Sequence, residues 1–176
     1  MTFKFYRYKK VKSTNDIAIQ KIKKNFKKGI IVSDNQMKGR GQYGKKWISF
    51  KGNLFISIFF SINKTISLKK INHFNCKILK KALSKIINCK IAIKKPNDLL
   101  INKKKFAGVL QETIIQNDKK YLIIGIGINM IKSPSIRNYP STNIFKETGL
   151  KIHKEELIQI ILKEFKKNLK KFELNV

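Results

Sequence analysis

The chain has 176 residues, enough for one domain with a proper hydrophobic core and too few for two ordinary domains. Its 42% hydrophobic content excludes a disordered chain, and no apolar run reaches the roughly 18 to 20 residues that cross a bilayer. The net charge of +30 would suit a polyanion partner. The lysines, however, are scattered along the whole chain, and only Arg7, Arg40 and Arg137 are arginine. We therefore attribute the charge to a drift in amino-acid composition on solvent-exposed surfaces rather than to a dedicated nucleic-acid-binding surface.

The N-terminal stretch MTFKFYRYKKVK alternates aromatic and cationic residues and lacks the apolar run of about 7 to 15 residues that a signal peptide needs. Cys76 and Cys89 stand thirteen positions apart, and with His73 and His153 as the only histidines they have no metal-ligand spacing. Two free thiols fit a reducing compartment. We therefore expect a cytoplasmic protein without a membrane segment or a metal-binding residue set.

The first predicted helix covers about residues 15–27. It opens with the polar triplet STN, in which Ser13 and Asp16 have the spacing of a helix-capping pair, and its apolar residues follow at helical steps. The segment GIIVSD predicts a short strand at 29–34. The segment NLFISIFFSI, at 53–62, alternates with period two and predicts a strand with one wholly apolar face.

The rest of the chain predicts a helix, an antiparallel meander and a final helix. These elements are a helix at 68–88, a strand that stops at Pro96, a hairpin of 99–101 with 106–115, a strand at 121–130, and a helix at about 153–172 with Leu157, Ile161, Phe165, Leu169 and Phe172 along one stripe. This order predicts an α+β domain with helices on a mixed, largely antiparallel sheet. It is not the regular alternation of a Rossmann domain.

The segment KGRGQYGKKW, at 38–47, has glycines that allow a close approach to an anion and cations that could hold it. Its glycines fit GxGxxG, but the segment leads into a strand rather than a helix, and Lys46 stands where a Walker loop has Ser or Thr. Arg40 could bind an anion through two hydrogen bonds, and Trp47 offers a flat face for a base. A mobile basic hairpin loop is the alternative interpretation.

Lys94 ends a predicted strand directly before the segment that contains Pro96, Asn97 and Asp98. A lysine at a strand end can neutralise a carboxylate or phosphate whose charge shifts during a reaction. The alternative is one more surface lysine among many.

The segment YLIIGIGINM places Gly125, Gly127 and Asn129 on one face of its strand, opposite an apolar face. Glycine weakens a strand unless something must approach its backbone closely. The pattern indicates a ligand laid across the sheet. A strand packed tightly under a helix would explain the glycines equally well, but not the asparagine.

Five segments stand in the order found in biotin–protein ligases, and the resemblance covers about residues 11–172. They are STN, NQMKGRGQYGKKW, GNLFISI, KKPNDLLINKKKFAGVLQE and IIGIGINM. The resemblance implies a mixed sheet flanked by helices, related to the cores of class II aminoacyl-tRNA synthetases and lipoate ligases.

The family resemblance also implies a reaction in two steps. Biotin's carboxylate attacks the α-phosphate of ATP and gives biotinyl-5′-AMP and pyrophosphate, with Mg²⁺ screening the phosphates. A lysine of a biotin carboxyl carrier domain then attacks the activated carbonyl and releases AMP. The implied partners are biotin, ATP and the carrier domain of a carboxylase, with no specific nucleic acid and no membrane, and the protein is expected to be a monomer or a homodimer.

The resemblance assigns roles residue by residue. The residues implied for biotin are Ser13, Thr14, Asn15, Gln36, Arg40, Gly41, Gln42 and Lys94. The residues implied for ATP or the adenylate are Gly39, Arg40, Trp47, Lys94 and Asn129, and Lys94 and Arg40 are the implied catalytic pair, with Lys94 the first choice. The 38–47 segment then corresponds to a loop that orders over the acyl-phosphate and keeps water away from it.

The chain departs from the family pattern at two positions. Gln42 stands where many members have a second loop arginine, which predicts looser retention of the adenylate, and Lys95 replaces a tryptophan that often precedes the Pro-Asn-Asp segment. We expect one catalytic domain over 1–176. Without the N-terminal DNA-binding domain of many members, we expect no repressor role. Without their C-terminal small β-barrel, we expect weaker activity.

Three rival functions remain open. A lipoate or octanoate ligase would use the same core, although its acid lacks biotin's ureido group and needs the Ser-Thr-Asn cluster less. A small basic nucleic-acid-binding protein would explain the charge but not Lys94 or Asn129. A decayed ligase would fold without turning over.

Overall fold

The computed structural model describes residues 3–65, 67–137 and 139–169. Its elements in chain order are β1 (Lys4–Tyr8), α1 (Thr14–Lys23), β2 (Lys28–Ser33), the short 3-10 helix η1 (Gln42–Gly44), β3 (Leu54–Ile62), α2 (Leu68–Leu83), β4 (Ile91–Lys94), β5 (Asp98–Ile101), β6 (Lys104–Gln116), β7 (Lys119–Ile128), α3 (Ile144–Thr148) and α4 (Lys154–Leu169).

Seven strands form one sheet in the order β1-β2-β3-β7-β6-β5-β4. Of the described strand pairs, β1–β2 is parallel and the others are antiparallel. The predicted mixed, largely antiparallel sheet with flanking helices is therefore confirmed.

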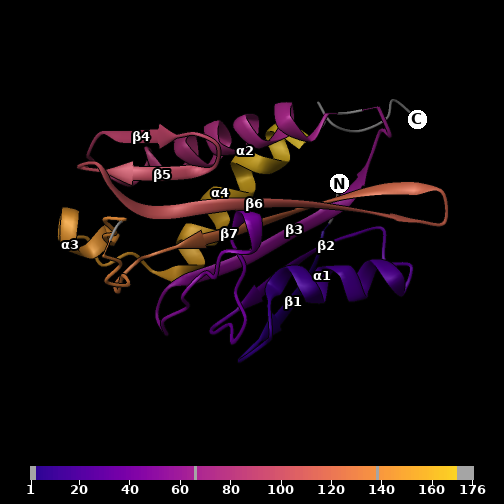
Figure 1. Ribbon diagram of the computed structural model, residues 1–176, viewed down its shortest axis with the longest axis horizontal. Helices are drawn as coiled ribbons and strands as arrows, with labels where there is room; N and C mark the ends of the chain where they lie inside the picture. Colours follow the sequence, from indigo (N-terminus) through magenta and orange to yellow (C-terminus); the bar gives the residue numbers. More distant parts are fainter. Residues whose placement is uncertain (1–2, 66, 138, 170–176) are drawn as a thin grey trace.

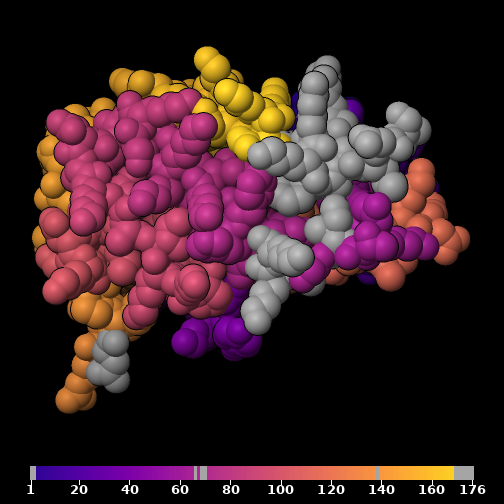
Figure 2. Space-filling view, turned by 90° about the horizontal axis from the view of Figure 1, so that it is seen from above, coloured from indigo at the N-terminus to yellow at the C-terminus, as the bar shows by residue number. Residues whose placement is uncertain are grey.

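The sheet lies between two helical layers (Figure 1). Helix α1 packs on one face, where Ala18 and Ile22 join Phe59 and Ile123 in a small core. Helices α2 and α4 cover the opposite face and form the larger core with the strands. Figure 2 looks onto this side of the molecule, where the part of the chain that includes α2 and the β4–β5 hairpin covers a broad area. The face under α1 is less completely covered by helices, which leaves room for a ligand.

The predicted hairpin and the turn after it are confirmed by β5, β6 and β7. The β5–β6 turn places Asn102 and Lys103 at φ values of 49° and 61°, and the β6–β7 turn places Asn117 and Asp118 at 47° and 56°. Two successive residues with positive φ are typical of tight hairpin turns, and Asn and Asp tolerate this conformation better than most residues.

Some predicted boundaries and contacts are wrong. Helix α1 ends at Lys23, and the predicted Ser13–Asp16 capping pair is not made, because Ser13 forms no capping bond through its side chain and Asp16 instead contacts Arg40. Helix α2 ends at Leu83 rather than at 88. In the final helix Leu157, Ile161 and Phe165 are buried as predicted. The side chain of Leu169 and all of Phe172 lie outside the described residues.

Strand β1 and helix α3 were not predicted from the sequence. In β1 the alternating aromatic and basic residues are those of a half-exposed edge strand. Helix α3 has five residues, too few for a helical period, although Asn143 caps it by accepting a hydrogen bond from the Lys146 backbone N–H at 2.8 Å. Within the described ranges, no helix is both long and apolar enough to cross a membrane.

Candidate functional site

A cavity of about 700 Å³ lies on the α1 face of the sheet. Its walls come from the start of α1, the 36–48 segment, the ends of β4 and β7, the β5–β6 region and the 134–141 segment. The sequence-predicted residues that line it are Ser13, Thr14, Asn15, Gln36, Arg40, Gly41, Gln42, Trp47, Lys94 and Asn129. Residues spread over more than a hundred positions of sequence are thus brought to one place, as the sequence predicted.

Gly39 is the predicted site residue that does not line this cavity. It is buried, and a Cβ added to it would lie 2.6 Å from the backbone oxygen of Trp47. Its carbonyl accepts a hydrogen bond of 2.9 Å from the Trp47 backbone N–H. The absence of a side chain at Gly39 lets the two arms of the 38–47 loop approach each other.

A row of residues paired directly across five strands crosses the floor of the cavity, and all of them line the cavity except Phe55, which is fully buried beside it. In register from β3 to β4 the row reads Phe55, Gly127, Gly108, Asp98 and Lys94. Two of its central members are glycines, so the sheet has no side chain at the middle of the row.

Each glycine of β7 is approached by a different group. A Cβ on Gly127 would lie 2.5 Å from Cε2 of Trp47, and one on Gly125 would lie 2.4 Å from Oδ1 of Asn15. Gly125 therefore allows the start of α1 to approach, as the tight-packing interpretation predicts, and Gly127 allows the Trp47 indole to pack on the strand as an aromatic wall of the cavity. Both residues line the cavity.

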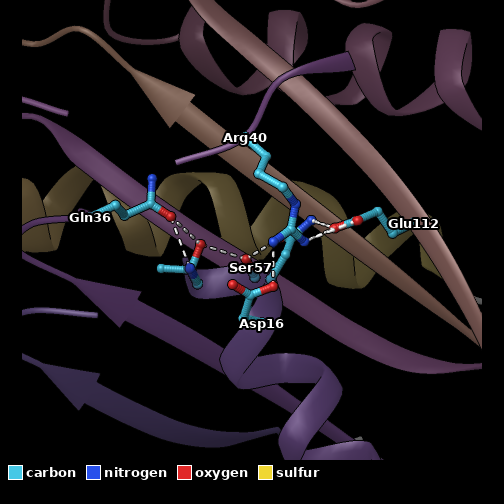
Figure 3. Close-up of polar contacts among 7 residues, drawn as sticks. Asp16, Gln36, Arg40, Ser57 and Glu112 are labelled. Atoms are coloured by element: carbon cyan, nitrogen blue, oxygen red, sulfur yellow. Dashed lines mark hydrogen bonds and ion pairs between the residues drawn. The ribbon is translucent and has the colours of Figure 1, made fainter. Parts of the chain in front are cut away.

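The start of α1 presents buried polar groups joined in a chain of hydrogen bonds (Figure 3). Gln36 Oε1 accepts from the Thr14 backbone N–H at 2.8 Å and from Thr14 Oγ1 at 3.2 Å. Ser57 Oγ lies 2.7 Å from Thr14 Oγ1 and 2.5 Å from Asn15 Oδ1. Donors and acceptors of this kind, held in fixed orientations, suit a small polar head group that both donates and accepts hydrogen bonds.

Arg40 reaches from the 38–47 loop to two carboxylates (Figure 3). Its guanidinium contacts Asp16 on α1 and donates to Glu112 on β6 at 2.9 and 3.0 Å. Burial alone would lower the pKa of Arg40, but the hydrogen bonds and charges of the two carboxylates outweigh it and raise the pKa. The guanidinium is therefore permanently charged at the edge of the cavity.

Two lysines face the cavity at the other end of the glycine row. Lys94 is exposed, and its Nζ lies 4.4 Å from the centre of the Tyr139 ring. Lys105 is 22% exposed, with Nζ 2.6 Å from Asp98 Oδ1 and 5.3 Å from the centre of the Trp47 ring. The Lys105 ammonium is held more firmly than that of Lys94, because the buried Asp98 carboxylate and the face of the Trp47 ring both contact it.

Tyr139 closes this end of the cavity and donates a hydrogen bond to Asp98 Oδ2. Burial, together with Asp98, raises the pKa of the Tyr139 phenol well above its usual range. Tyr139 therefore stays a neutral donor at physiological pH.

Asn129 is 2% exposed at the end of β7 and is held by its neighbours. Its Nδ2 donates to the Thr142 carbonyl at 3.1 Å, and its Oδ1 accepts from Asn53 Nδ2 at 3.3 Å. The indole Nε1 of Trp47, in contrast, is buried without a hydrogen-bond partner in the described part of the chain. Such a donor is satisfied when a ligand supplies an acceptor.

Sequence reasoning missed Ser57, Lys105, Glu112 and Tyr139. Glu112 offered a usable signal, because an acid inside a predicted strand is rare in a chain with 10 acidic and 40 basic residues. Lys105 was hidden in a run of three lysines, and Ser57 in a regular strand alternation.

The described residues include no group of three or more His, Cys, Asp or Glu side chains that could hold a metal ion.

The family model for the biotin/lipoate A/B protein ligase family matches residues 8–129, and this chain belongs to that family.

Curated relatives of this chain include bifunctional ligase/repressors and biotin–protein ligases. The chain is 28% identical over 172 residues to the bifunctional ligase/repressor BirA of Escherichia coli, covering 93% of this chain and 52% of BirA. It is 30% identical to the BirA of Bacillus subtilis, covering 91% of this chain and 52% of that relative. The chain thus spans about half the length of these curated relatives.

Among solved structures, the biotin protein ligase from Aquifex aeolicus in complex with biotin and ATP superposes with a TM-score of 0.79 and 31% sequence identity. The match covers 97% of this chain and 72% of the Aquifex chain. The seven-stranded sheet and its helices therefore share the fold of this biotin protein ligase.

Proposed function

We propose that this chain joins biotin to ATP as biotinyl-5′-AMP and then transfers biotin to a lysine of a biotin carboxyl carrier domain. The observation that carries the proposal is the convergence on one cavity of every predicted biotin-binding residue and of every predicted nucleotide-binding residue except Gly39. The relatives and the solved structure named above are biotin ligases, which supports biotin over other acids.

The proposed orientation places biotin's fused-ring head at the start of α1. Buried Ser13, Thr14 and Asn15, with half-buried Gln36, offer donors and acceptors there to the ureido group. The valeryl chain would run along the cavity past Asn15, which packs on Gly125, and Trp47, which packs on Gly127. The carboxylate would then reach the lysines at the far end of the row.

In the first step, a carboxylate oxygen of biotin attacks the α-phosphorus of ATP, and the bond to the β-phosphate oxygen breaks to release pyrophosphate. The attacking carboxylate and the phosphates are all anionic, so the site must supply positive charge. Lys105, Lys94 and Arg40 supply it, and Mg²⁺ bound to the phosphates adds more. Lys105 is the better-placed lysine because Asp98 holds it in position.

In the second step, the neutral amine of the acceptor lysine attacks the activated carbonyl. An amide bond forms, the bond from the carbonyl carbon to the phosphate oxygen breaks, and AMP leaves with that oxygen. The amine loses a proton in the process. The 38–47 loop protects the mixed anhydride from water until the acceptor arrives.

ATP and unpaired cysteines both suit the cytoplasm, where we place the reaction. The proposed enzyme acts as a monomer or a homodimer.

The proposal is tested by incubating the purified chain with ATP, Mg²⁺, biotin and a purified biotin carboxyl carrier domain. Mass spectrometry should find one added biotinyl group, on one lysine of the carrier. ATP–pyrophosphate exchange measured with biotin and with lipoate separates this function from its nearest rival. Exchange stimulated by lipoate alone would make the chain a lipoate ligase, and no exchange with either acid would indicate a ligase that folds without turning over.

A further inference from the structure

Glu112 places a negative charge beside a cavity proposed to bind two anions. The chain has only 10 acidic residues against 40 basic ones, yet Asp16 and Glu112 both lie on Arg40. A carboxylate facing the ligands would repel them. Glu112 does not line the cavity, and it contacts residues that do. Its charge therefore acts on the protein's own side chains.

The Glu112 carboxylate joins three separate segments. Its Oε2 accepts from Asn15 Nδ2 at 2.6 Å and from Arg40 Nη2 at 2.9 Å, and its Oε1 accepts from the same Arg40 nitrogen at 3.0 Å. One side chain of β6 thereby links the start of α1 to the 38–47 loop (Figure 3).

The contact with Asn15 sets the direction of its amide. An ionised carboxylate only accepts hydrogen bonds, so the NH₂ group of Asn15 must face Glu112 and its carbonyl oxygen must point away. That oxygen lies 2.5 Å from Ser57 Oγ and against the backbone of Gly125. Without Glu112, a flipped amide would present the wrong group to the head of the ligand.

Asp16 and Glu112, the two acids that contact Arg40, differ in their other contacts. Asp16 contacts Arg40, whereas Glu112 contacts both Arg40 and Asn15. Changes at the two positions therefore separate the anchoring of the loop from the orientation of Asn15.

We propose that Glu112 is a positioning residue that fixes the amide of Asn15 and anchors Arg40, and so couples recognition of the ligand's head to closure of the 38–47 loop. The part of this inference that concerns biotin rests on the proposed function. The anchoring of the loop does not, and it is measurable without any ligand.

The test compares Glu112→Gln and Asp16→Asn with Glu155→Gln. Glu155 is a matched control because it forms an exposed pair with Arg7, both side chains being more than half exposed, and it does not line the cavity. Three quantities are measured: the KM and kcat for biotin in ATP–pyrophosphate exchange, the rate of tryptic cleavage within 38–47, and the fluorescence of Trp47, the single tryptophan. Thermal melting confirms that each variant is folded.

Glu112→Gln should raise the KM for biotin roughly tenfold or more, the scale expected for losing hydrogen bonds to a charged group. It should also speed cleavage of the ligand-free loop and reduce the biotin-induced change in Trp47 fluorescence. Asp16→Asn should speed cleavage with less than about a threefold change in KM, since it leaves Asn15 in place. Glu155→Gln should match the wild type in all three quantities.

A second pair of variants tests the amide direction alone. Asn15→Asp sets two carboxylates against each other and should raise the KM for biotin steeply. Adding Glu112→Gln supplies an NH₂ group to that aspartate, and the double variant should bind biotin better than Asn15→Asp alone. Failure of this rescue would overturn the orienting role.

The anchoring role is overturned if folded Glu112→Gln is cleaved at the same rate as Glu155→Gln. A wild-type protein without biotin-dependent exchange would contradict the proposed function instead, while the cleavage experiment would still decide whether Glu112 anchors the loop.

Discussion

Gly127 of β7 lies directly against the indole ring of Trp47, with three ring atoms between 2.5 and 2.9 Å from the position that a Cβ would occupy. This contact joins the 38–47 loop to the middle of the sheet. It also makes the loop's position sensitive to a single methyl group.

Gly127→Ala should therefore displace Trp47 while leaving the strand intact, because the backbone at Gly127 has no positive φ that would exclude alanine. We expect at least a roughly tenfold loss of biotin-dependent exchange, the scale of local overpacking. Trp47 fluorescence and exchange rates measure the effect. The double variant Gly127→Ala/Trp47→Ala should lose no more activity than Trp47→Ala alone, and additive losses would show that the methyl group acts elsewhere.

Lys105→Ala should reduce the rate of adenylate formation by roughly 100- to 1,000-fold, as expected for removing a positioned charge from a polar transition state. Lys94→Ala should also reduce it, but less, because Lys94 is exposed and Asp98 does not hold its ammonium. Single-turnover formation of biotinyl-AMP distinguishes the two. Exposed Lys90 provides the control, since Lys90→Ala removes the same charge away from the cavity. If Lys94→Ala reduced the rate of adenylate formation more than Lys105→Ala did, Lys94 would be the more important of the two lysines.

Glu164 of α4 is 4% exposed and paired with Lys85, with Lys81 nearby. The hydrogen bond from Lys85, which outweighs the opposing effect of burial, lowers the pKa of Glu164 below its ordinary value of 4.5. A carboxylate with a lowered pKa in the folded state stabilises the fold above the ordinary pKa, and this contribution is lost as the pH falls through the lowered pKa.

Glu164→Gln should therefore reduce the free energy of unfolding at neutral pH by about 1 to 3 kcal/mol. The difference from the wild type should shrink below about pH 4. Urea unfolding at several pH values measures it, with the exposed Glu156→Gln on the same helix as the control. A difference that stayed constant down to pH 2 would rule out the ionised pair as its source.

The two cysteines should differ in reactivity. Burial, assisted by the negative charge of Asp98, raises the pKa of the Cys76 thiol to about 12, so hardly any thiolate forms near neutral pH. Burial also raises the pKa of Cys89, but this residue is only partly buried. With iodoacetamide at about pH 8, mass spectrometry should find Cys89 modified first and Cys76 untouched until the protein is denatured. Equal labelling of the native protein would contradict the burial of Cys76.

The sequence predicted the fold where periodicity is strong. The alternation in β3 and the polar turn segments at 102–105 and 116–120 were sufficient, because each depends on residues adjacent in the chain. Strand β1 was missed because KFYRY alternates two residue types that are both partly exposed at a sheet edge. The capping prediction was wrong because Asp16 has a stronger partner from another segment, Arg40, which local spacing cannot reveal.

The same limit applies to the site. Motifs identified residues that line the cavity, but Lys105, Ser57 and Glu112 owe their positions to strand register and to contacts between distant segments. Glu112 acts through Asn15, which is 97 positions away. No local pattern encodes such a pair.

The cross-strand row from Phe55 to Lys94 takes one residue from each of five strands. The row exists only after β3, β7, β6, β5 and β4 have paired, so the binding surface is complete only when these five strands have assembled. Vitamin and nucleotide should consequently protect the entire domain against unfolding, by an amount set by their concentrations and affinities. A substitution at a buried β4 residue outside the cavity, such as Ile91, would weaken ligand binding by disturbing the strand that carries Lys94.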